Sequence, residues 1–210
     1  MIILTAGHTG AGTGAQCAET HFDEGAENIW LRNRVAEILT NKYGLVVLMD
    51  DDTASLKLLV KELSRDTACR VLSVNRPTNN QSNKRANARQ DTARRVPTSN
   101  DFVIDLHFNA HGNPQARGTE TIVADDATEL ELRMASRLAH ATADSLDIPL
   151  RSIKSELETP HRRLAMLHLT PQSIILEVCF CTSPEDVDAY RNNREKLAAE
   201  LAWVIAELIE

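Results

Sequence analysis

The sequence lacks the features of a membrane-spanning, secreted or nucleic-acid-binding chain. No apolar run approaches the ~20 residues that would cross a bilayer. No basic and apolar leader precedes the first strand-like segment at Ile2, so we expect synthesis in the cytoplasm without a signal peptide. The 23 Lys and Arg are outnumbered by 30 Asp and Glu, and the net charge of −7 argues against nonspecific binding to nucleic acid or to anionic membranes.

Cysteine is scarce, and its spacing is not that of a zinc ribbon. We expect the four cysteines to be reduced thiols that mostly pack in the core: Cys17, Cys69, Cys179 and Cys181. Strand alternation predicts that Cys179 and Cys181 share a face with Glu177, and a core role is favoured over metal ligation. The chain also lacks an internal repeat, so its 210 residues predict one domain over 1–210.

Apolar runs typical of buried strands alternate with segments of helical periodicity. The expected strands are residues 2–5, 45–49, 102–107, 118–124 and 172–180. The expected helices are 24–43, 130–146 and 194–209, with weaker ones at 56–63 (continuing toward 71) and 85–95 around a polar loop at 76–84. Because the strands are almost continuously apolar, the pattern predicts an α/β fold: a mostly parallel, twisted sheet with helices on both faces.

A glycine-rich stretch, GHTGAGTGA, follows the first strand at residues 7–15. The spacing from Gly10 to Ala15 fits a dinucleotide-binding loop, but residues 16–23 are polar and do not provide the helix that this loop requires. P-loop spacing is also present, without the Lys and Ser/Thr of that motif. A flexible surface loop and a metal-binding loop around His8 remain as the interpretations.

Side chains suited to zinc lie where the predicted strands end. His8 follows the first strand, His107 ends the third, and Glu24 opens the helix after the glycine-rich loop. The carboxyl ends of strands in α/β sheets are where sites form, and two imidazoles with one carboxylate leave a fourth zinc position open. Each residue also has a structural interpretation: a hydrogen-bonded histidine at a strand end, or a glutamate that favours the helix dipole.

Glu177 is a fourth candidate, because it lies within the apolar strand sequence IILEVCF. A buried carboxylate without a partner is costly, so it serves either as a general base or as the partner of Arg162 or Arg163. The basic stretch 88–95 is interpreted as a solvated helix face, with contact to an anionic polymer as the alternative.

Four motifs in chain order extend this pattern over almost the whole sequence. They are AGHTGAGTGA at 6–15, DEGAENIWLRNRVAEIL at 23–39, DLHFNA with GTET at 105–110 and 118–121, and LEVCFCTSPED at 176–186. With these motifs the chain resembles the zinc-dependent N-acetylmuramoyl-L-alanine amidases, the cell-wall amidase family of bacteria and phage lysins.

The resemblance implies a function and a role for each candidate. The activity would be hydrolysis of the amide between the lactyl group of N-acetylmuramic acid and L-alanine, with peptidoglycan as the partner. His8, His107 and Glu24 would hold Zn²⁺, with Glu27 as the reserve ligand. Glu177 would be the catalytic carboxylate. Asn109 would orient the site or the substrate.

Two other functions are compatible with these residues. One is a zinc carboxypeptidase on a similar sheet, in which Arg117 or Arg163 would bind the substrate carboxylate. The other is a catalytically inactive peptidoglycan-binding domain. Without a signal peptide, we expect the protein to reach the cell wall through lysis or another export route, as a phage or prophage lysin would.

Overall fold

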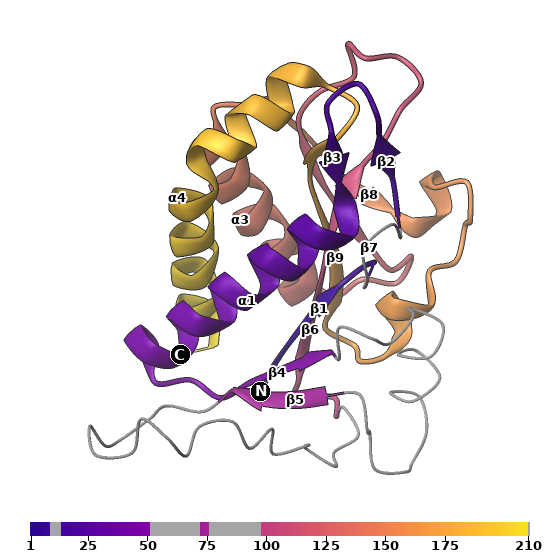
Figure 1. Ribbon diagram of the computed structural model, residues 1–210. Helices are drawn as coiled ribbons and strands as arrows, with labels where there is room; N and C mark the ends of the chain where they lie inside the picture. Colours follow the sequence, from indigo (N-terminus) through magenta and orange to yellow (C-terminus); the bar gives the residue numbers. More distant parts are fainter. Residues whose placement is uncertain (9–13, 51–71, 76–97, 210) are drawn as a thin grey trace.

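The structure is a computed structural model that describes residues 1–8, 14–50, 72–75 and 98–209 (Figure 1). Strands and helices alternate along the chain. In chain order the elements are β1 (Ile2–Ala6), β2 (Gln16–Cys17), β3 (Phe22–Asp23), α1 (Glu24–Tyr43), β4 (Val47–Asp50), β5 (Leu72–Asn75), β6 (Phe102–Asn109), β7 (Thr119–Val123), α3 (Glu129–Leu146), β8 (Leu150–Ser155), the 3₁₀ helices η1 (Glu156–Glu158) and η2 (Ala165–His168), β9 (Ser173–Phe180) and α4 (Pro184–Ile209).

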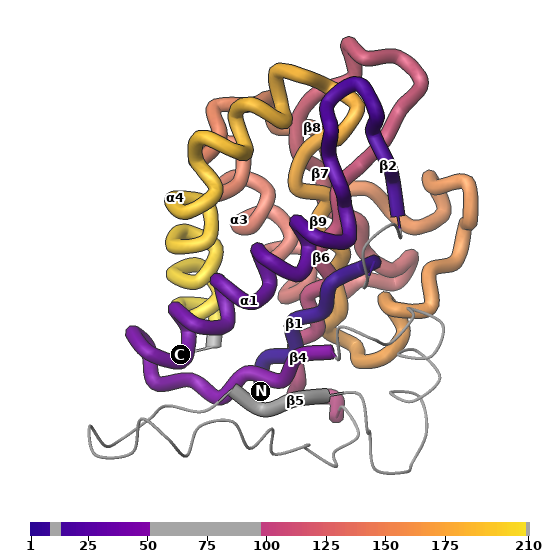
Figure 2. The backbone as a smooth tube through the Cα atoms, viewed as in Figure 1, coloured from indigo at the N-terminus to yellow at the C-terminus, as the bar shows by residue number. Residues whose placement is uncertain are grey.

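Seven strands form one sheet in the order β5-β4-β1-β6-β9-β7-β8 (Figure 2). Strands β4, β1, β6 and β9 are parallel, and Ile2 lies opposite both Val47 and Phe102. β7 and β8 run parallel to each other and antiparallel to β9, and β5 is antiparallel to β4. The central strands are buried and apolar, as a sheet covered on both faces requires. The predicted α/β domain with a mostly parallel sheet is confirmed.

The two faces of the sheet are covered differently. The three long helices α1, α3 and α4 lie on one face (Figure 1), where Leu4, Leu106 and Leu176 point into the core that they share. The two 3₁₀ helices belong to the opposite side, where Leu167 of η2 packs against Ile175. Because side chains alternate along a strand, the polar residues of β6 and β9 face this second side.

Both ends of α1 agree with the sequence prediction. The Asp23 side chain accepts a hydrogen bond of 3.2 Å from the Ala26 N–H, which caps the first turn. Gly44 ends the helix in the left-handed conformation, with φ of 70°, which glycine adopts without strain. These caps fix Glu24 as the first residue of the helix.

The start of the last helix differs from the prediction. α4 begins at Pro184 rather than near residue 194. The Ser183 hydroxyl accepts a hydrogen bond of 3.3 Å from the Asp186 N–H, which caps the helix. Proline suits the first helical position because an N–H there would have no partner within the helix. The prediction was wrong because it interpreted this cap as a turn between strand and helix.

Two strand pairs are irregular, and both irregularities change which side chains reach the second face. The pairing of β6 with β9 shifts after His107 and Glu177, so that Asn109 lies opposite Phe180. β9 has one more residue than β6 between these two pairs, and this extra residue turns Cys179 and Cys181 into the core beneath the long helices. Their predicted core role is confirmed, but the expectation that they share the face of Glu177 was wrong.

Several predicted segments lie outside the described residues. They are the helices at 56–63 and 85–95, the polar loop at 76–84 and Cys69. The short strands β2, β3, β5 and β8 were not predicted, since they are brief or, like β8 with its sequence LRSIKS, polar. In the described part of the chain, no helix combines the length and apolar character needed to span a membrane.

Candidate metal centre and catalytic cleft

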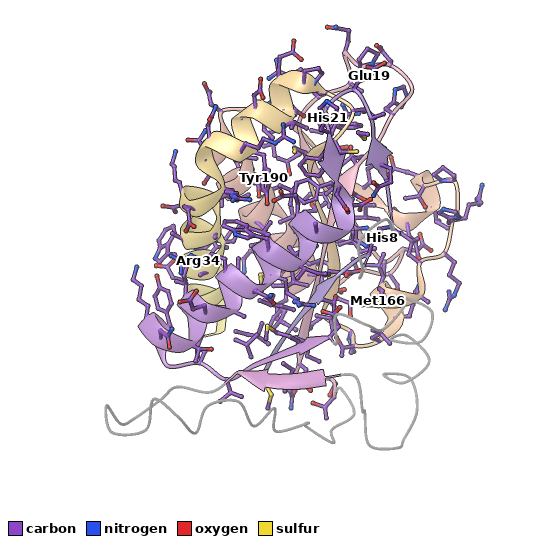
Figure 3. The ribbon with its side chains drawn as sticks, viewed as in Figure 1. His8, Glu19, His21, Arg34, Met166 and Tyr190 are labelled. Carbon is purple, nitrogen blue, oxygen red and sulfur yellow. The ribbon has the colours of Figure 1, made fainter. Side chains whose placement is uncertain are left out.

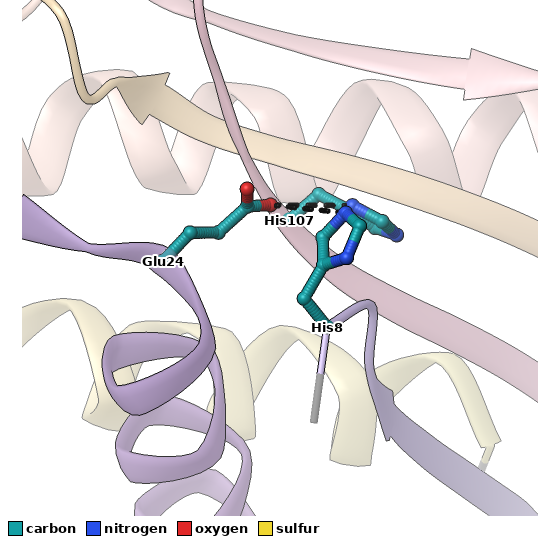
Figure 4. A group of neighbouring side chains, drawn as sticks. All are labelled: His8, Glu24 and His107. Atoms are coloured by element: carbon teal, nitrogen blue, oxygen red, sulfur yellow. Dashed lines mark ion pairs between the residues drawn. The ribbon is translucent and has the colours of Figure 1, made fainter. Parts of the chain in front are cut away.

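Three side chains from separate elements meet at the carboxyl ends of β1 and β6 (Figure 4). His8 follows β1, Glu24 opens α1, and His107 lies near the end of β6. Oε1 of Glu24 is 3.4 Å from Nδ1 of His107 and 3.9 Å from Nε2 of His8. One nitrogen from each ring and one carboxylate oxygen lie within 4.8 Å of one another, so the predicted trio forms a single cluster.

The cluster has a donor set that Zn²⁺ accepts, and two of its separations are near those of a zinc site. Ligand atoms about 2.0–2.1 Å from a tetrahedral Zn²⁺ lie roughly 3.3 Å from one another. The Glu24–His107 separation of 3.4 Å matches this, and the Glu24–His8 separation of 3.9 Å needs only a small side-chain adjustment. Burial lowers the pKa of His8, which favours the neutral imidazole that a metal requires. These three residues could therefore hold a metal ion.

Main-chain donors hold the Glu24 carboxylate in place. The Ala15 N–H donates to Oε2 at 2.7 Å, and the Phe108 N–H donates to Oε1 at 3.2 Å. Burial alone would raise the pKa of Glu24, but hydrogen bonds from His107 and from the Ala15 N–H outweigh it and hold the pKa below its usual value. The carboxylate is thus kept ionised and aimed at the two histidines.

Two glycines of the opening motif leave room for the cluster. A Cβ atom built on Gly7 would overlap the imidazole ring of His107. A Cβ on Gly14 would come within 2.6 Å of the Glu24 carboxylate and 2.8 Å of the His8 ring, and the φ of +76° at Gly14 is itself unfavourable for other residues. Glycine at these two positions therefore serves the close approach of side chains, as a metal-binding loop would require.

The ring of His107 is oriented by Asp105, a residue that the sequence analysis did not single out. Nε2 of His107 lies 3.0 Å from Oδ2 of Asp105, and the Thr5 hydroxyl donates to Oδ1 of Asp105 at 2.7 Å. With Nε2 donating to this carboxylate, the neutral ring presents the lone pair of Nδ1 to the cluster. Burial opposes a charge on His107, but Asp105, followed by Glu24, raises the pKa of the metal-free imidazole well above its usual value.

Glu27, the reserve ligand, points to a different part of the molecule. Its Oε2 accepts hydrogen bonds from the Tyr190 hydroxyl and from Nη1 of Arg194, each at 3.1 Å. Both partners belong to α4, and Figure 3 shows Tyr190 on the helical side of the sheet. The geometry therefore favours Glu24 over Glu27.

A buried ion pair supports the end of β1 just before Gly7. Oδ1 of Asp50 accepts a hydrogen bond of 2.7 Å from Nη1 of Arg32 and one of 3.1 Å from the Ala6 N–H. Burial raises the pKa of Asp50 to about 6, against the opposing effect of Arg32. The pair ties α1 and β4 to the strand that leads to Gly7 and His8.

Glu177 lies beside the cluster, directly opposite His107 on the neighbouring strand β9. Among the described residues, its Oε2 is buried and has no hydrogen-bond partner. The predicted alternative of an arginine partner is not observed, since Arg162 and Arg163 are exposed and neither forms a hydrogen bond with Oε2 of Glu177. Burial raises the pKa of Glu177 to about 7, with Glu24, Glu120 and Asp105 adding to the rise and His107 opposing it.

The cluster opens into a cavity of 840 Å³ on the face of the sheet away from the long helices. His8, His107 and Glu177 line one part of it, and Asn109 lies next to them. Figure 3 shows His8 and Met166, both of which line this cavity, on the same side of the sheet. The predicted catalytic, metal-ligating and substrate-binding residues are thus brought to one cleft.

A polar network on the far wall of the cavity was missed by the sequence analysis. Glu120 of β7 accepts hydrogen bonds of 2.8 Å from Asn109, Arg151 and Lys154. Arg117, which had been considered as a substrate-carboxylate ligand, instead binds Asp186 at 3.0 Å. The only available signal for Glu120 was its place in GTET, two strands away from His107.

The fold and site can now be compared with solved structures. An N-acetylmuramoyl-L-alanine amidase from Clostridium difficile 630 matches with a TM-score of 0.66 and 20% identity, over 99% of this chain and 94% of that one. A putative N-acetylmuramoyl-L-alanine amidase from Neisseria meningitidis matches with a TM-score of 0.66 and 24% identity, over 98% and 93%. The catalytic domain of the CD27L endolysin, which targets Clostridia difficile, matches with a TM-score of 0.61 and 21% identity, over 99% and 95%.

Comparison at the level of sequence adds the family. A search of curated proteins returns no match. The sequence model of one family, described as N-acetylmuramoyl-L-alanine amidase, matches residues 2–210 and so covers nearly the whole chain. The protein therefore belongs to the N-acetylmuramoyl-L-alanine amidase family.

Proposed function

We propose that the protein is a zinc hydrolase that cleaves the amide between the lactyl group of N-acetylmuramic acid and L-alanine of peptidoglycan. One observation carries the proposal: His8, Glu24 and His107 could together hold a metal, and His8 and His107 line the same cavity as Glu177, whose Oε2 has no hydrogen-bond partner among the described residues. Family membership supports the bond and the substrate, and the donor set of two imidazoles and one carboxylate supports zinc.

The residues of the cleft would divide the reaction between them. When bound to His8, Glu24 and His107, Zn²⁺ supplies Lewis acidity, which polarises a carbonyl and makes water a better nucleophile. Oε2 of Glu177 accepts the proton of the attacking water and delivers it to the departing alanine nitrogen. Its buried, partner-free oxygen and its pKa of about 7 suit both transfers near neutral pH.

Asn109 would orient the substrate rather than react with it. Its side chain lines the cavity and is fixed by a hydrogen bond of 2.8 Å from its amide nitrogen to Glu120. Its amide oxygen accepts the Ala110 N–H at 2.9 Å, which sets the direction of the amide plane. A rigid amide at the cavity wall is a suitable hydrogen-bonding group for a sugar or peptide.

Mass spectrometry of the material released from purified peptidoglycan, with and without a chelator, tests the proposal. We expect chelator-sensitive release of stem peptides that begin with L-alanine and leave intact glycan strands. Glu177→Gln should keep the metal and lower the rate at least 100-fold, because the proton acceptor is lost while the ligands remain. Glu129→Gln, an exposed substitution of the same type on α3, is the matched control and should leave the rate unchanged.

The products also decide between the alternatives. Release of single amino acids would indicate a carboxypeptidase. Against this alternative, the two arginines considered as ligands of a substrate carboxylate are placed elsewhere: Arg117 binds Asp186, and Arg163 is exposed and is not among the residues that line the cavity. Binding to peptidoglycan without any release, even with zinc present, would indicate an inactive binding domain. Retention of more than a few per cent of the rate by Glu177→Gln would contradict the role of Glu177.

A further inference from the structure

Among the described residues, carboxylates line both sides of the cavity, with Glu120 and Glu158 on the wall away from the metal-ligand cluster, whereas Lys and Arg side chains lie on that wall only. Asp105 and Glu177 are close to the metal-ligand cluster. The Lys and Arg side chains that line the cavity, within the part of the chain that the structure describes, are Arg151 and Lys154. Both belong to β8, the edge strand of the sheet, which is separated from β6 by β9 and β7. A substrate bound across the cavity would therefore meet positive charge only at some distance from the metal.

A strand irregularity places these two cations on the same face. Thr119 pairs with Leu150 and Thr121 with Ile153, so β8 has one more residue than β7 between these pairs. In a regular strand, Arg151 and Lys154, three positions apart, would point to opposite faces. The extra residue turns both side chains toward the cavity.

The network on this wall leaves hydrogen-bond donors unused. Glu120 accepts one hydrogen bond from Nε of Arg151 and one from Nζ of Lys154, while Glu158 on the same wall accepts the Ser155 N–H at 2.9 Å. Nη1 of Arg151 donates to the Arg117 carbonyl, and its guanidinium lies over the Phe180 ring at 5.0 Å. Among the described residues, Nη2 of Arg151 and two of the three ammonium protons of Lys154 have no acceptor, so the wall can accept a second carboxylate.

The position of this wall fits the length of one peptide unit. Glu120 lies directly opposite Glu177 on the next strand, and strands are about 4.8 Å apart. The Lys154 ammonium binds Glu120 at 2.8 Å from the β8 side, so it lies farther from the catalytic carboxylate than Glu120 does, by more than one strand spacing in all. In a stem peptide the α-carbon of the second residue is roughly 5 Å from the scissile amide nitrogen, since consecutive α-carbons are 3.8 Å apart.

We propose that Arg151 and Lys154 form a subsite that binds the free α-carboxylate of the second residue of the stem peptide, a D-glutamate linked through its side chain. This inference rests on the proposed amidase function and deepens it. The bound carboxylate would share the two cations with Glu120 and place the L-alanine amide between the metal ligands and Glu177. Stem peptides in which that carboxylate is a primary amide would lose this contact.

Binding of three N-acetylated stem tripeptides to the zinc-loaded full chain, measured by calorimetry, tests the subsite. The first peptide has D-glutamate and an amidated C-terminus, and the second has D-isoglutamine and an amidated C-terminus. The third has D-isoglutamine and a free C-terminus. We expect the first to bind at least 10-fold more tightly than the other two, because only it offers a carboxylate at the second residue.

Variants separate recognition from structural support. Lys154→Gln and Arg151→Gln should each weaken binding of the D-glutamate peptide about 10-fold and change binding of the D-isoglutamine peptide less than 2-fold. Lys154→Arg should restore most of the preference, since it keeps the charge. Arg133→Gln removes an equal charge from the exposed face of α3 and should change neither affinity. Thermal melts of every variant show whether the fold is retained.

The outcomes are distinguishable from failure of the proposed function. Equal binding of the first two peptides, no binding of any, or an equal loss for both peptides in the variants would overturn the subsite. Preference for the third peptide would assign the cations to a terminal carboxylate and would also favour a carboxypeptidase. The hydrolysis assay on peptidoglycan judges the amidase activity separately, since binding of these peptides does not depend on cleavage of the wall.

Discussion

Glu24 and Glu27 show how strongly a single helical turn separates two chemically equal residues. Glu24 faces His8 and His107, whereas Glu27 faces Tyr190 and Arg194 of α4. Three residues advance the helix by about 4.5 Å and leave the side chain about 60° around the axis, which is enough to move it from the end of the sheet to the neighbouring helix. Removal of the two carboxylates should therefore affect metal binding differently.

Glu24→Ala should lose most of the bound zinc, whereas Glu27→Ala should retain it. The first substitution removes a ligand of the cluster, and the second removes contacts between α1 and α4. Elemental analysis of the two purified proteins after dialysis against zinc-free buffer measures the difference. Equal zinc content, or lower zinc in Glu27→Ala, would contradict the assignment.

The residues of the site were predictable where a polar residue stands in or next to an apolar run of the sequence. His8 and His107 stand near the ends of apolar runs and Glu177 stands within one, where a polar residue is conspicuous. Asp105 has an equivalent signal, two positions before His107 on the same strand face, but it was not interpreted. Arg151 was not predictable, because it lies on a polar edge strand and reaches the cavity through an irregularity of register.

At the level of elements, β1 and β6 approach each other closely where the metal loop begins. The Gly7 N–H donates to the Leu106 carbonyl at 2.8 Å, and the His107 ring lies against the Gly7 backbone. The strands can hold this geometry only while position 7 carries no side chain. The close contact of β1 with β6 at this point therefore depends on glycine at position 7.

Gly7→Ala should lower the free energy of unfolding by about 1–3 kcal/mol and weaken zinc binding, because the added methyl group must displace the His107 ring. Gly112→Ala is the matched control, since a Cβ there meets no atom within 4 Å. Denaturant titration and zinc competition with a coloured chelator measure both effects. Similar behaviour of the two variants would show that the strands can separate at this point.

A second contact between elements makes stability depend on pH. The folded pKa of Asp50 is about 6, above the usual 3.8, so the folded state holds this proton more tightly than the unfolded state does. The stabilisation is complete below about pH 4 and is lost as the pH rises through 6. Relative to Asp50→Asn, the wild-type protein should lose about 2–3 kcal/mol of unfolding free energy between pH 4 and pH 7.

Urea denaturation of both proteins across this pH range isolates the contribution of Asp50. The difference between the two curves is the relevant quantity, because Asp50→Asn also weakens the contact with Arg32 at every pH. Parallel curves would show that Asp50 titrates near its ordinary value in the folded protein.

For the whole molecule, the metal-ligand cluster joins parts of the chain that are far apart in sequence. His8, Glu24 and His107 come together only when β1, α1 and β6 are assembled. The unfolded chain does not offer this arrangement, so an ion bound to the cluster stabilises the folded state alone.

Saturating zinc should raise the melting temperature, and a chelator should reverse the effect. At a free zinc concentration of 1,000 times Kd the stabilisation is about 4 kcal/mol, which is roughly 8–16 °C for a domain of this size. Glu24→Ala should show a much smaller shift. Scanning calorimetry of both proteins gives the result, and equal melting temperatures with zinc and with chelator would contradict a metal bound at this cluster.

The alternation of strands and helices made the overall fold predictable, because each central strand is a run of apolar residues in the sequence. The sheet order and the polar strand β8 were not predictable, since pairing partners far apart in sequence leave no local signal.

The two N–H groups that hold the Glu24 carboxylate belong to the main chain at Ala15 and Phe108. Every residue except proline offers the same main-chain donor, so these two hydrogen bonds to Glu24 do not depend on the side chain at either position. A library of substitutions at position 15 should therefore keep zinc as far as the local packing allows, with proline as the exception that removes the donor itself. Phe108 is also held by its packing against Phe22 and Tyr190, so position 15 is where the side chain can vary while Glu24 stays directed at the two histidines.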